Sequence, residues 1–258
     1  MHTSTPLMRG LMLLPSLLLL LLHPGTAQQR TASPLTLARH NAWLMFLSDA
    51  RLSKRWGLHT EVQVLRTRTS ELGYQNVFRG GANYYATDNF VLTGGYAYSQ
   101  VVADDTYTGA TGAEHRLYQQ LQLHDAKSRL RLHHRYRLEQ RWVQLRPGQD
   151  FTYLNRMRYQ LQLVLPLLGP ELSNGMPYAV AANEVFLGFG RGSGGRLFQQ
   201  NRAYLGVGYQ ISKASAVELG YLNQFVQLPL EGRPELNENM QLSLCFNPDW
   251  RRALPVGK

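Results

Sequence analysis

The stretch "RLRLHHRYRLEQRW", from Arg129 to Trp142, places a charged or polar side chain at every second position. Guanidinium groups bind carboxylates and phosphates through paired hydrogen bonds, so a row of arginines could hold or select anions. Similar rows occur in "EHRLYQQLQL", in "NRMRYQLQLVL" and in two later segments. The charged residues that we expect on this shared face are Glu114, Arg116, Arg129, Arg131, Arg135, Arg137, Glu139, Arg141, Arg156, Arg158, Glu184, Arg202 and Glu218.

The period of two indicates β-strands, because successive side chains leave a strand on opposite faces. The face opposite the arginines carries mostly leucine and aromatic residues. The same alternation predicts strands at residues 39–48, 55–67, 74–86, 89–101, 112–124, 128–142, 151–165, 177–189, 197–211, 214–227 and 236–246.

The N-terminus has the composition of an export signal. Arg9 precedes a short apolar run from Leu11 to Leu22, and small residues, Gly25 and Ala27, follow it. The run is shorter than the roughly 20 apolar residues of a membrane-spanning helix. We therefore predict a signal peptide over residues 1–27.

An exported chain of alternating strands can form an outer-membrane barrel, whose apolar face meets lipid and whose polar face lines the lumen. Short connections such as "ATDN", "DAKS" and "SKAS" alternate with longer, Gly- and Pro-rich ones, as in such barrels. The connection at 166–177 is too long for its expected short side. Aromatic residues fall near predicted strand ends, as in an interfacial girdle: Trp56, Trp142, Tyr153 and Phe225.

The predicted fold is an all-β, antiparallel, up-and-down transmembrane barrel. Bacterial single-chain barrels have an even number of strands, so the eleven candidates suggest about twelve, with ten as the alternative. The predicted organisation is a signal peptide (1–27), an N-terminal segment (28–38), the barrel (39–246) and a C-terminal tail (247–258). A secreted or periplasmic β-sandwich or lipocalin-like binding protein remains the soluble alternative.

The net charge and the cysteine content limit the classes of binding partner that we expect. The chain carries 27 Lys and Arg against 17 Asp and Glu, a formal net charge of +10, and one cysteine, Cys245. The expected partners are outer-membrane lipid and lipopolysaccharide, the barrel-assembly machinery and small anionic solutes. Export argues against nucleic acid. No motif predicts a cofactor or a metal site, and the glycines of "GFGRGSGG" lack the strand-to-helix context of a dinucleotide loop.

Several stretches resemble a known family: "LSKRWGLHTEVQVLR", "EHRLYQQL", "RYRLEQRW", "NRMRYQLQL", "ANEVFLGFG", "QNRAYLGVGYQIS" and "ELGYLNQ". Together they are similar to the bacterial family catalogued as domain of unknown function 2490, over nearly the whole mature chain. The resemblance implies an outer-membrane β-barrel and supplies no catalytic residue. One departure is the tail after Phe246, because barrel proteins usually end on an aromatic residue.

A two-residue turn at Ala126–Lys127 would place Leu123 opposite Leu130, both towards lipid. In that register Arg116 lies diagonal to Glu139, and Glu114 to Arg137. A loop centred on Ser193 would place Glu184 opposite Arg202. Two functions stay open for this lumen, namely cross-bracing of a narrow barrel and a passive, anion-preferring passage.

A third possibility is a lipid-acting outer-membrane enzyme. His134 and Gln119 form a polar pair on the lipid-facing side, opposite each other in the predicted register. A polar pair in an apolar field is costly unless it is satisfied. Because no serine or threonine occupies a neighbouring position, we name no catalytic residue.

The signal peptide can be tested directly. Cleavage near Ala27 should leave a mature chain that begins near Gln28. Mass spectrometry of the membrane-extracted protein should give the mass of that shorter chain, and a chain that still begins at Met1 would contradict the export prediction.

Overall fold

The structure is a computed structural model that describes residues 36–67, 74–102, 111–125, 129–144, 148–190, 197–227 and 234–251. The predicted signal peptide, the centre of the Ala126–Lys127 turn, Ser193 and the last seven residues of the tail lie outside these ranges. No part of the described chain forms a helix of the length and apolarity that a membrane crossing requires.

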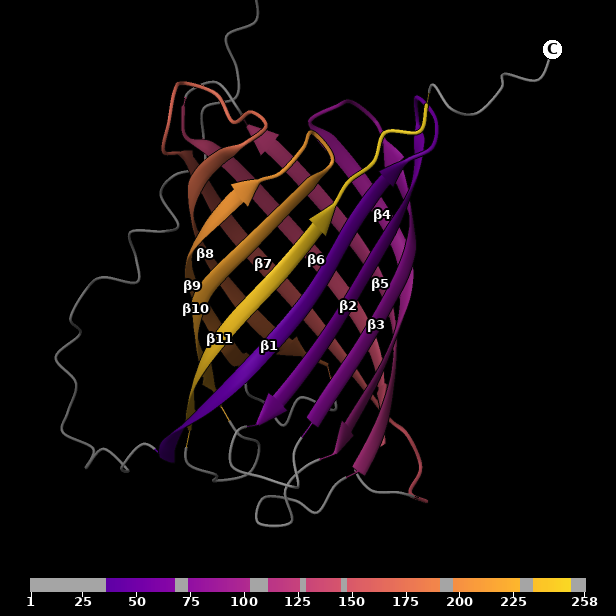
Figure 1. The fold of residues 1–258 in the computed structure, drawn as a ribbon. Coiled ribbons are helices and arrows are strands. Elements are labelled where there is room, and N and C mark those ends of the chain that lie inside the picture. The colour runs from indigo at the N-terminus through magenta and orange to yellow at the C-terminus, as the bar shows by residue number, and fades with distance from the viewer. Residues whose placement is uncertain are drawn as a thin grey trace, which may run out of the picture. The chain divides into compact units, whose positions relative to one another are not determined.

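Eleven strands close into one barrel, which confirms the all-β class (Figure 1). In chain order they are β1 (Thr36–Arg51), β2 (Trp56–Thr67), β3 (Tyr74–Tyr85), β4 (Phe90–Val102), β5 (Thr111–Asp125), β6 (Arg131–Val143), β7 (Thr152–Pro166), β8 (Met176–Phe189), β9 (Phe198–Gln210), β10 (Ser215–Val226) and β11 (Glu235–Phe246).

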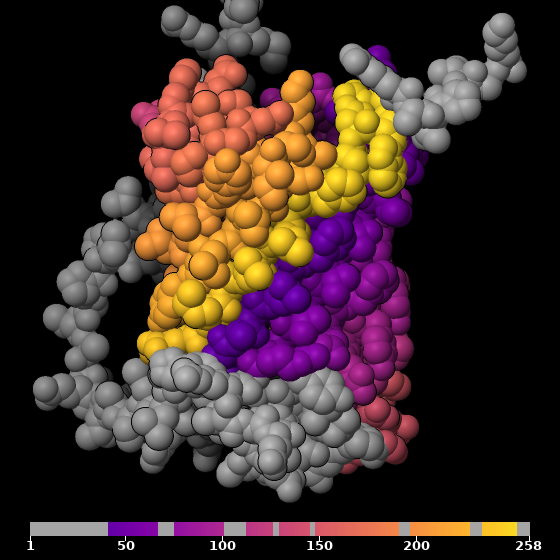
Figure 2. Space-filling view, viewed as in Figure 1, coloured from indigo at the N-terminus to yellow at the C-terminus, as the bar shows by residue number. Residues whose placement is uncertain are grey.

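The predicted strand numbers, twelve or ten, are wrong. Consecutive strands pair antiparallel, and β1 closes the barrel by pairing with β11 in parallel. The parallel seam follows from the odd count, because the first and last of eleven up-and-down strands run in the same direction. Its ladder extends from Arg39↔Asn237 to Leu47↔Cys245. In the space-filling view, β1 and β11 are adjacent diagonal bands of indigo and yellow (Figure 2).

The connections alternate between two ends of the barrel, and those at one end are short apart from residues 167–175. The end with residues 52–55, 86–89, 126–130, 167–175 and 211–214 is called the turn end, and the opposite end the loop end. β1 begins at the loop end and β11 finishes at the turn end. Past Phe246 the chain stays beside β1, because Arg51 N–H donates to the Pro248 carbonyl at 2.8 Å and Trp250 N–H to the Arg51 carbonyl at 2.8 Å.

The packing of Leu172 explains why the connection at 167–175 is long. Leu172 packs against a cluster of buried apolar side chains inside the barrel, so the segment turns inward over the turn end. Gly169 and Gly175, near its two ends, have φ values of +75° and +76°, which other residues rarely adopt. A simple tight turn could not carry an apolar side chain back into the barrel mouth.

The predicted register between β5 and β6 was wrong by four residues. Leu123 lies opposite His134, not Leu130, and Leu121 lies opposite Tyr136. The connection runs over residues 126–130, since β6 begins only at Arg131. A shift by an even number keeps every side chain on its predicted face.

Apolar side chains face outward from this barrel and charged side chains face inward, which is the reverse of a soluble domain. Outward-facing side chains are large, apolar and exposed around the whole barrel, including Leu44, Leu58, Phe78, Leu92, Leu117, Leu138, Met157, Phe189, Leu205, Leu219, Met240 and Leu244. Aromatic pairs lie near strand ends, Trp56 with Tyr84 at 5.2 Å between ring centroids and Trp142 with Tyr153 at 5.4 Å. An apolar band of this extent on a monomer marks an interaction surface, for lipid or for another protein.

The face assignment makes a matched pair of variants possible. Leu138 and Gln120 lie near the middle of neighbouring strands, Leu138 outward and Gln120 buried in the lumen, where it accepts a hydrogen bond from Arg137. If the outward face meets lipid, as the sequence predicts, Leu138→Asp should block assembly into vesicles, because a charge on a lipid face at mid-depth costs about 2–4 kcal/mol for Lys or Arg and somewhat less for Asp. Gln120→Asp should assemble, since its carboxylate would face a guanidinium. Equal yields of heat-modifiable, folded barrel from both variants would contradict the assignment.

Candidate functional site in the barrel lumen

Nearly all the charged residues singled out in the sequence point into the lumen. Arg137, for example, has 1% of its surface exposed, although it lies on a strand whose other face carries exposed leucine. Arg129 is the exception. It lies just before β6 and donates to the carbonyls of Pro166 and Leu167 at 2.8–3.1 Å, at the turn end. It therefore supports the connection between β7 and β8 and lies outside the lumenal row.

Each of several lumenal glutamates lies between two guanidinium groups. Glu139 contacts Arg156 at 2.6 Å and Arg158 at 2.9 Å. Glu184 contacts Arg158 at 2.7 Å and Arg135 at 2.9 Å. We call the full set the arginine–glutamate network: Glu61, Arg79, Glu114, Arg116, Arg135, Arg137, Glu139, Arg141, Arg156, Arg158 and Glu184.

The pairings differ from those predicted. Glu114 contacts Arg116 on its own strand, at 2.6 Å, and Arg141, not Arg137. Glu139 contacts β7 instead of Arg116. The cause is the four-residue register shift, which places Arg116 opposite Arg141.

One prediction about β8 and β9 holds, because Glu184 lies opposite Arg202. The two do not form an ion pair, since Glu184 turns to Arg135 and Arg158. Arg202 instead lies over the rings of Trp43 and Phe186, 4.7 and 4.8 Å from their centroids.

The network crosses the lumen at mid-height. Arg137 on β6 reaches Glu61 on β2 at 3.3 Å, past the intervening strands β3, β4 and β5, while Arg79 contacts the same carboxylate at 2.5 Å. Arg137 also lies 5.1 Å from the centroid of the Tyr118 ring. The side chains of opposite walls therefore meet and brace the barrel.

Two glycines make room for this crossing. A Cβ on Gly81 or Gly95 would come within 2.8 or 2.5 Å of the Tyr118 hydroxyl oxygen. Their missing side chains let the Tyr118 ring lie close to the wall formed by β3 and β4. Glu61, Arg79 and these glycines were not predicted from the sequence, although alternation in "HTEVQVL" places Glu61 on a face with His59 and Gln63.

Three cavities of the described chain lie along the lumen, divided by these side chains. The loop-end cavity has a volume of about 300 Å³, and its charged lining is Arg79, Arg116, Arg141, Arg156, Arg158 and Arg202, against Glu114 alone. A central cavity of about 130 Å³ shares Arg158 and Arg202 with it. The turn-end cavity has about 750 Å³ and shares Arg135 and Glu218 with the central one.

Glu218 and Arg131, the remaining two predicted residues, both line cavities but differ in their contacts. Glu218 faces the turn-end and central cavities and accepts a hydrogen bond from the Tyr178 hydroxyl at 2.8 Å. Arg131 lines the turn-end cavity and, within the described chain, forms no hydrogen bond or ion pair.

The outward polar pair predicted from the sequence does not form. Gln119 and Gln140 exchange amide hydrogen bonds at 3.2–3.3 Å, and the His134 imidazole Nδ1 lies 3.0 Å from the Tyr159 hydroxyl. The register shift separates Gln119 from His134. In the described chain no serine or threonine hydroxyl joins His134, and no group of His, Cys, Asp and Glu is arranged to hold a metal.

The network predicts a large stability difference between two acid-to-amide variants. Glu139→Gln should destabilise the barrel by about 3–5 kcal/mol, because it leaves Arg156 and Arg158 short of a buried countercharge. Asp249→Asn is the control. Asp249 is exposed beyond β11, and its hydrogen bond with Arg251 lowers the pKa of Asp249 to about 2.

Urea unfolding of both refolded variants measures the effect. Asp249→Asn should unfold close to the wild type, since an exposed pair is screened by solvent. A Glu139→Gln midpoint equal to that of the control would show that the network does not stabilise the fold.

Comparison with known proteins places the chain in a family. The model of a family described as a protein of unknown function (DUF2490) matches residues 40–232. An uncharacterized protein of Methylorubrum extorquens is 31% identical over 173 residues, which cover 66% of this chain and 71% of that protein. No solved structure matched the chain significantly. The chain thus belongs to the DUF2490 family, as its strand sequences suggested.

Proposed function

We propose that this protein is a bacterial outer-membrane barrel that passes small anions slowly and passively through a braced lumen. The apolar outer face supports the membrane location, because hydrocarbon can cover large exposed side chains that water would not. A closed barrel also leaves no unpaired strand edge, which is a requirement for backbone in a bilayer. The predicted export signal agrees with this location.

The observation that carries the proposal is the excess of guanidinium groups inside the barrel. Arginines outnumber glutamates in the arginine–glutamate network, and Arg202 adds a further charge that no carboxylate neutralises in the described chain. Buried charges need a countercharge, and here mobile anions can supply it. Rings of arginine and lysine select anions in pores for the same reason.

The cross-bracing limits what can pass. Arg137 and Glu139 each have 1% exposure, and the central cavity holds only about 130 Å³. Passage would therefore need side-chain movement, and it favours small anions such as chloride or phosphate. A purely structural barrel is the second candidate, supported by the direct contact between Arg137 and Glu61 across the lumen.

The lipid-acting enzyme gains no support from the wall. His134 is hydrogen-bonded to a tyrosine hydroxyl, which is a weak nucleophile at neutral pH, and the outward amides satisfy each other. Polar side chains on an apolar face need hydrogen-bond partners of this kind, so these contacts are explained without a catalytic role.

Single-channel recording in a planar bilayer tests the proposal. The wild type in a salt gradient should show small conductance steps with a reversal potential that indicates anion preference. Arg202→Gln should lower the anion-to-cation permeability ratio about fivefold, as expected for the loss of about 1 kcal/mol of attraction at 4 Å in water. This variant leaves no carboxylate without its partner.

Arg55→Gln, on the exposed turn between β1 and β2, is the control and should keep the wild-type ratio. A silent wild-type protein would favour the structural candidate, and cation preference would contradict the proposed selectivity.

A further inference from the structure

The turn-end cavity has two unlike walls. Its volume of about 750 Å³ falls in the range of 300–1,000 Å³ that is typical of sites for small organic ligands. One wall, formed by β1, β7, β8, β10 and β11, carries the apolar side chains Leu47, Val164, Tyr178, Ala216 and Cys245 between polar ones such as Gln160, Gln162 and Glu218. The facing wall, from β5 and β6, presents His124, Arg131, His133 and Arg135.

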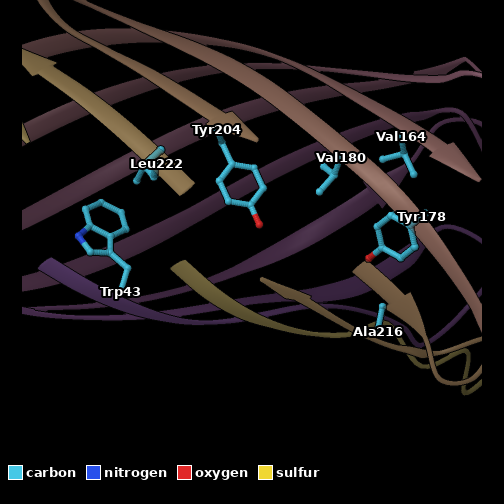
Figure 3. Close-up of a cluster of buried hydrophobic side chains, with 7 residues drawn as sticks. All are labelled: Trp43, Val164, Tyr178, Val180, Tyr204, Ala216 and Leu222. Atoms are coloured by element: carbon cyan, nitrogen blue, oxygen red, sulfur yellow. The ribbon is translucent and has the colours of Figure 1, made fainter. Parts of the chain in front are cut away.

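The apolar wall continues deeper into the barrel. Trp43, Val180, Tyr204 and Leu222 form one cluster with Val164, Tyr178 and Ala216 (Figure 3). Trp43, Tyr204 and Leu222 also line the central cavity. An apolar surface therefore extends from the turn end towards the middle of a lumen that is otherwise charged. A bracing network does not need such a surface, and neither does a path for small anions.

The facing wall has cationic groups that the protein itself does not use. These are Arg131 and Lys213, which form no hydrogen bond or ion pair within the described chain. The His133 imidazole adds a hydrogen-bonding group beside them and packs against the His124 ring, at 4.6 Å between centroids. This differs from the arginine–glutamate network, where every arginine contacts a carboxylate.

The carboxylates of the cavity are already engaged. Asp49 contacts the His59 imidazole at 2.8 Å and accepts from the Asn83 amide at 2.7 Å. Glu218 lies on the apolar wall and accepts from Tyr178. An anionic group from outside would therefore meet Arg131 on β6 and Lys213 at the turn before β10, neither of which has a carboxylate partner in the described chain.

The connection between β7 and β8 covers this cavity. Leu172, Ser173 and Asn174 line it, and Leu172 packs against the apolar cluster. The cover presents an apolar side chain inward and polar ones beside it. The segment over the cavity therefore offers both apolar and polar contacts, as the walls below it do.

We propose that the turn-end cavity binds a single-chain amphiphile with an anionic head, of the class of long-chain carboxylates. The head lies towards Arg131 and His133, and the chain lies along Leu47, Val164 and Tyr178, under Leu172. A small inorganic anion would leave the apolar wall wet, and a neutral hydrocarbon would leave the cations without a partner. The site is separate from the loop-end arginines, so it does not depend on anion passage.

Cys245 provides the test, because it is the single cysteine of the sequence and lines this cavity. The protein is reconstituted in lipid nanodiscs, which leave both barrel ends open to reagent. The rate of Cys245 modification by methyl methanethiosulfonate is measured with hexadecanoate, hexadecanol or acetate. Hexadecanoate at about ten times its Kd should slow modification about tenfold, because the free site falls by that factor. Hexadecanol and acetate should leave the rate within about twofold of the unliganded protein.

Two variants locate the head. Arg131→Gln should raise the half-protecting concentration of hexadecanoate about tenfold, as expected for the loss of one hydrogen bond to a charged group. Lys54→Gln removes an exposed charge at the same end, outside the cavity, and should leave that concentration unchanged.

Equal protection by hexadecanol and hexadecanoate would overturn the anionic head. No protection by either would overturn the site itself. These experiments measure protection of Cys245 and not conductance. Failure of the ligand site would therefore leave the proposed anion passage untouched, and that passage is tested by single-channel recording.

Discussion

Pairing between buried carboxylates and guanidinium groups is the constraint on which the barrel depends. A charge inside a protein is costly unless an opposite charge and hydrogen bonds compensate for it. Here Glu61, Glu114, Glu139 and Glu184 each receive two arginines, and Arg158 joins two of these carboxylates into one chain of contacts. The strands can place so many arginines inside only because the opposite and neighbouring strands supply these glutamates.

The closed sheet is the second constraint, and it follows from the first. An open sheet would expose one row of arginines at an edge and leave its backbone groups unpaired. The parallel seam between β1 and β11 removes both edges although the strand count is odd. The Asn41 side-chain amide donates a hydrogen bond of 2.8 Å to the Asn239 Oδ1 across this seam, inside the lumen. Polar contacts therefore bridge the one junction where the strand direction does not alternate.

The lumen divides around its circumference as well as along its axis. Strands β2 to β7 carry most of the charged network, while β1 and β7 to β10 carry the buried apolar cluster. Arg202 stands where the two meet, over Trp43 and Phe186. Such an asymmetric interior can offer an anion one surface and a hydrocarbon chain another, which is why the two ends of the same barrel support different ligands in our proposals.

The sequence by itself determined the strands and their faces. Alternation at period two is local, so "RLRLHHRYRLEQRW" placed Arg137 inward and Leu138 outward before any partner strand was known. The tertiary structure decided which residues meet. The register of β5 on β6 depends on where the connection at 126–130 ends, and a shift of four residues preserves the faces while it changes every pair. Closure by eleven strands, the contact of Arg137 with Glu61 and the inward turn of Leu172 all join residues far apart in the chain. Periodicity carries no information about such contacts, because they depend on how the whole sheet curls and closes.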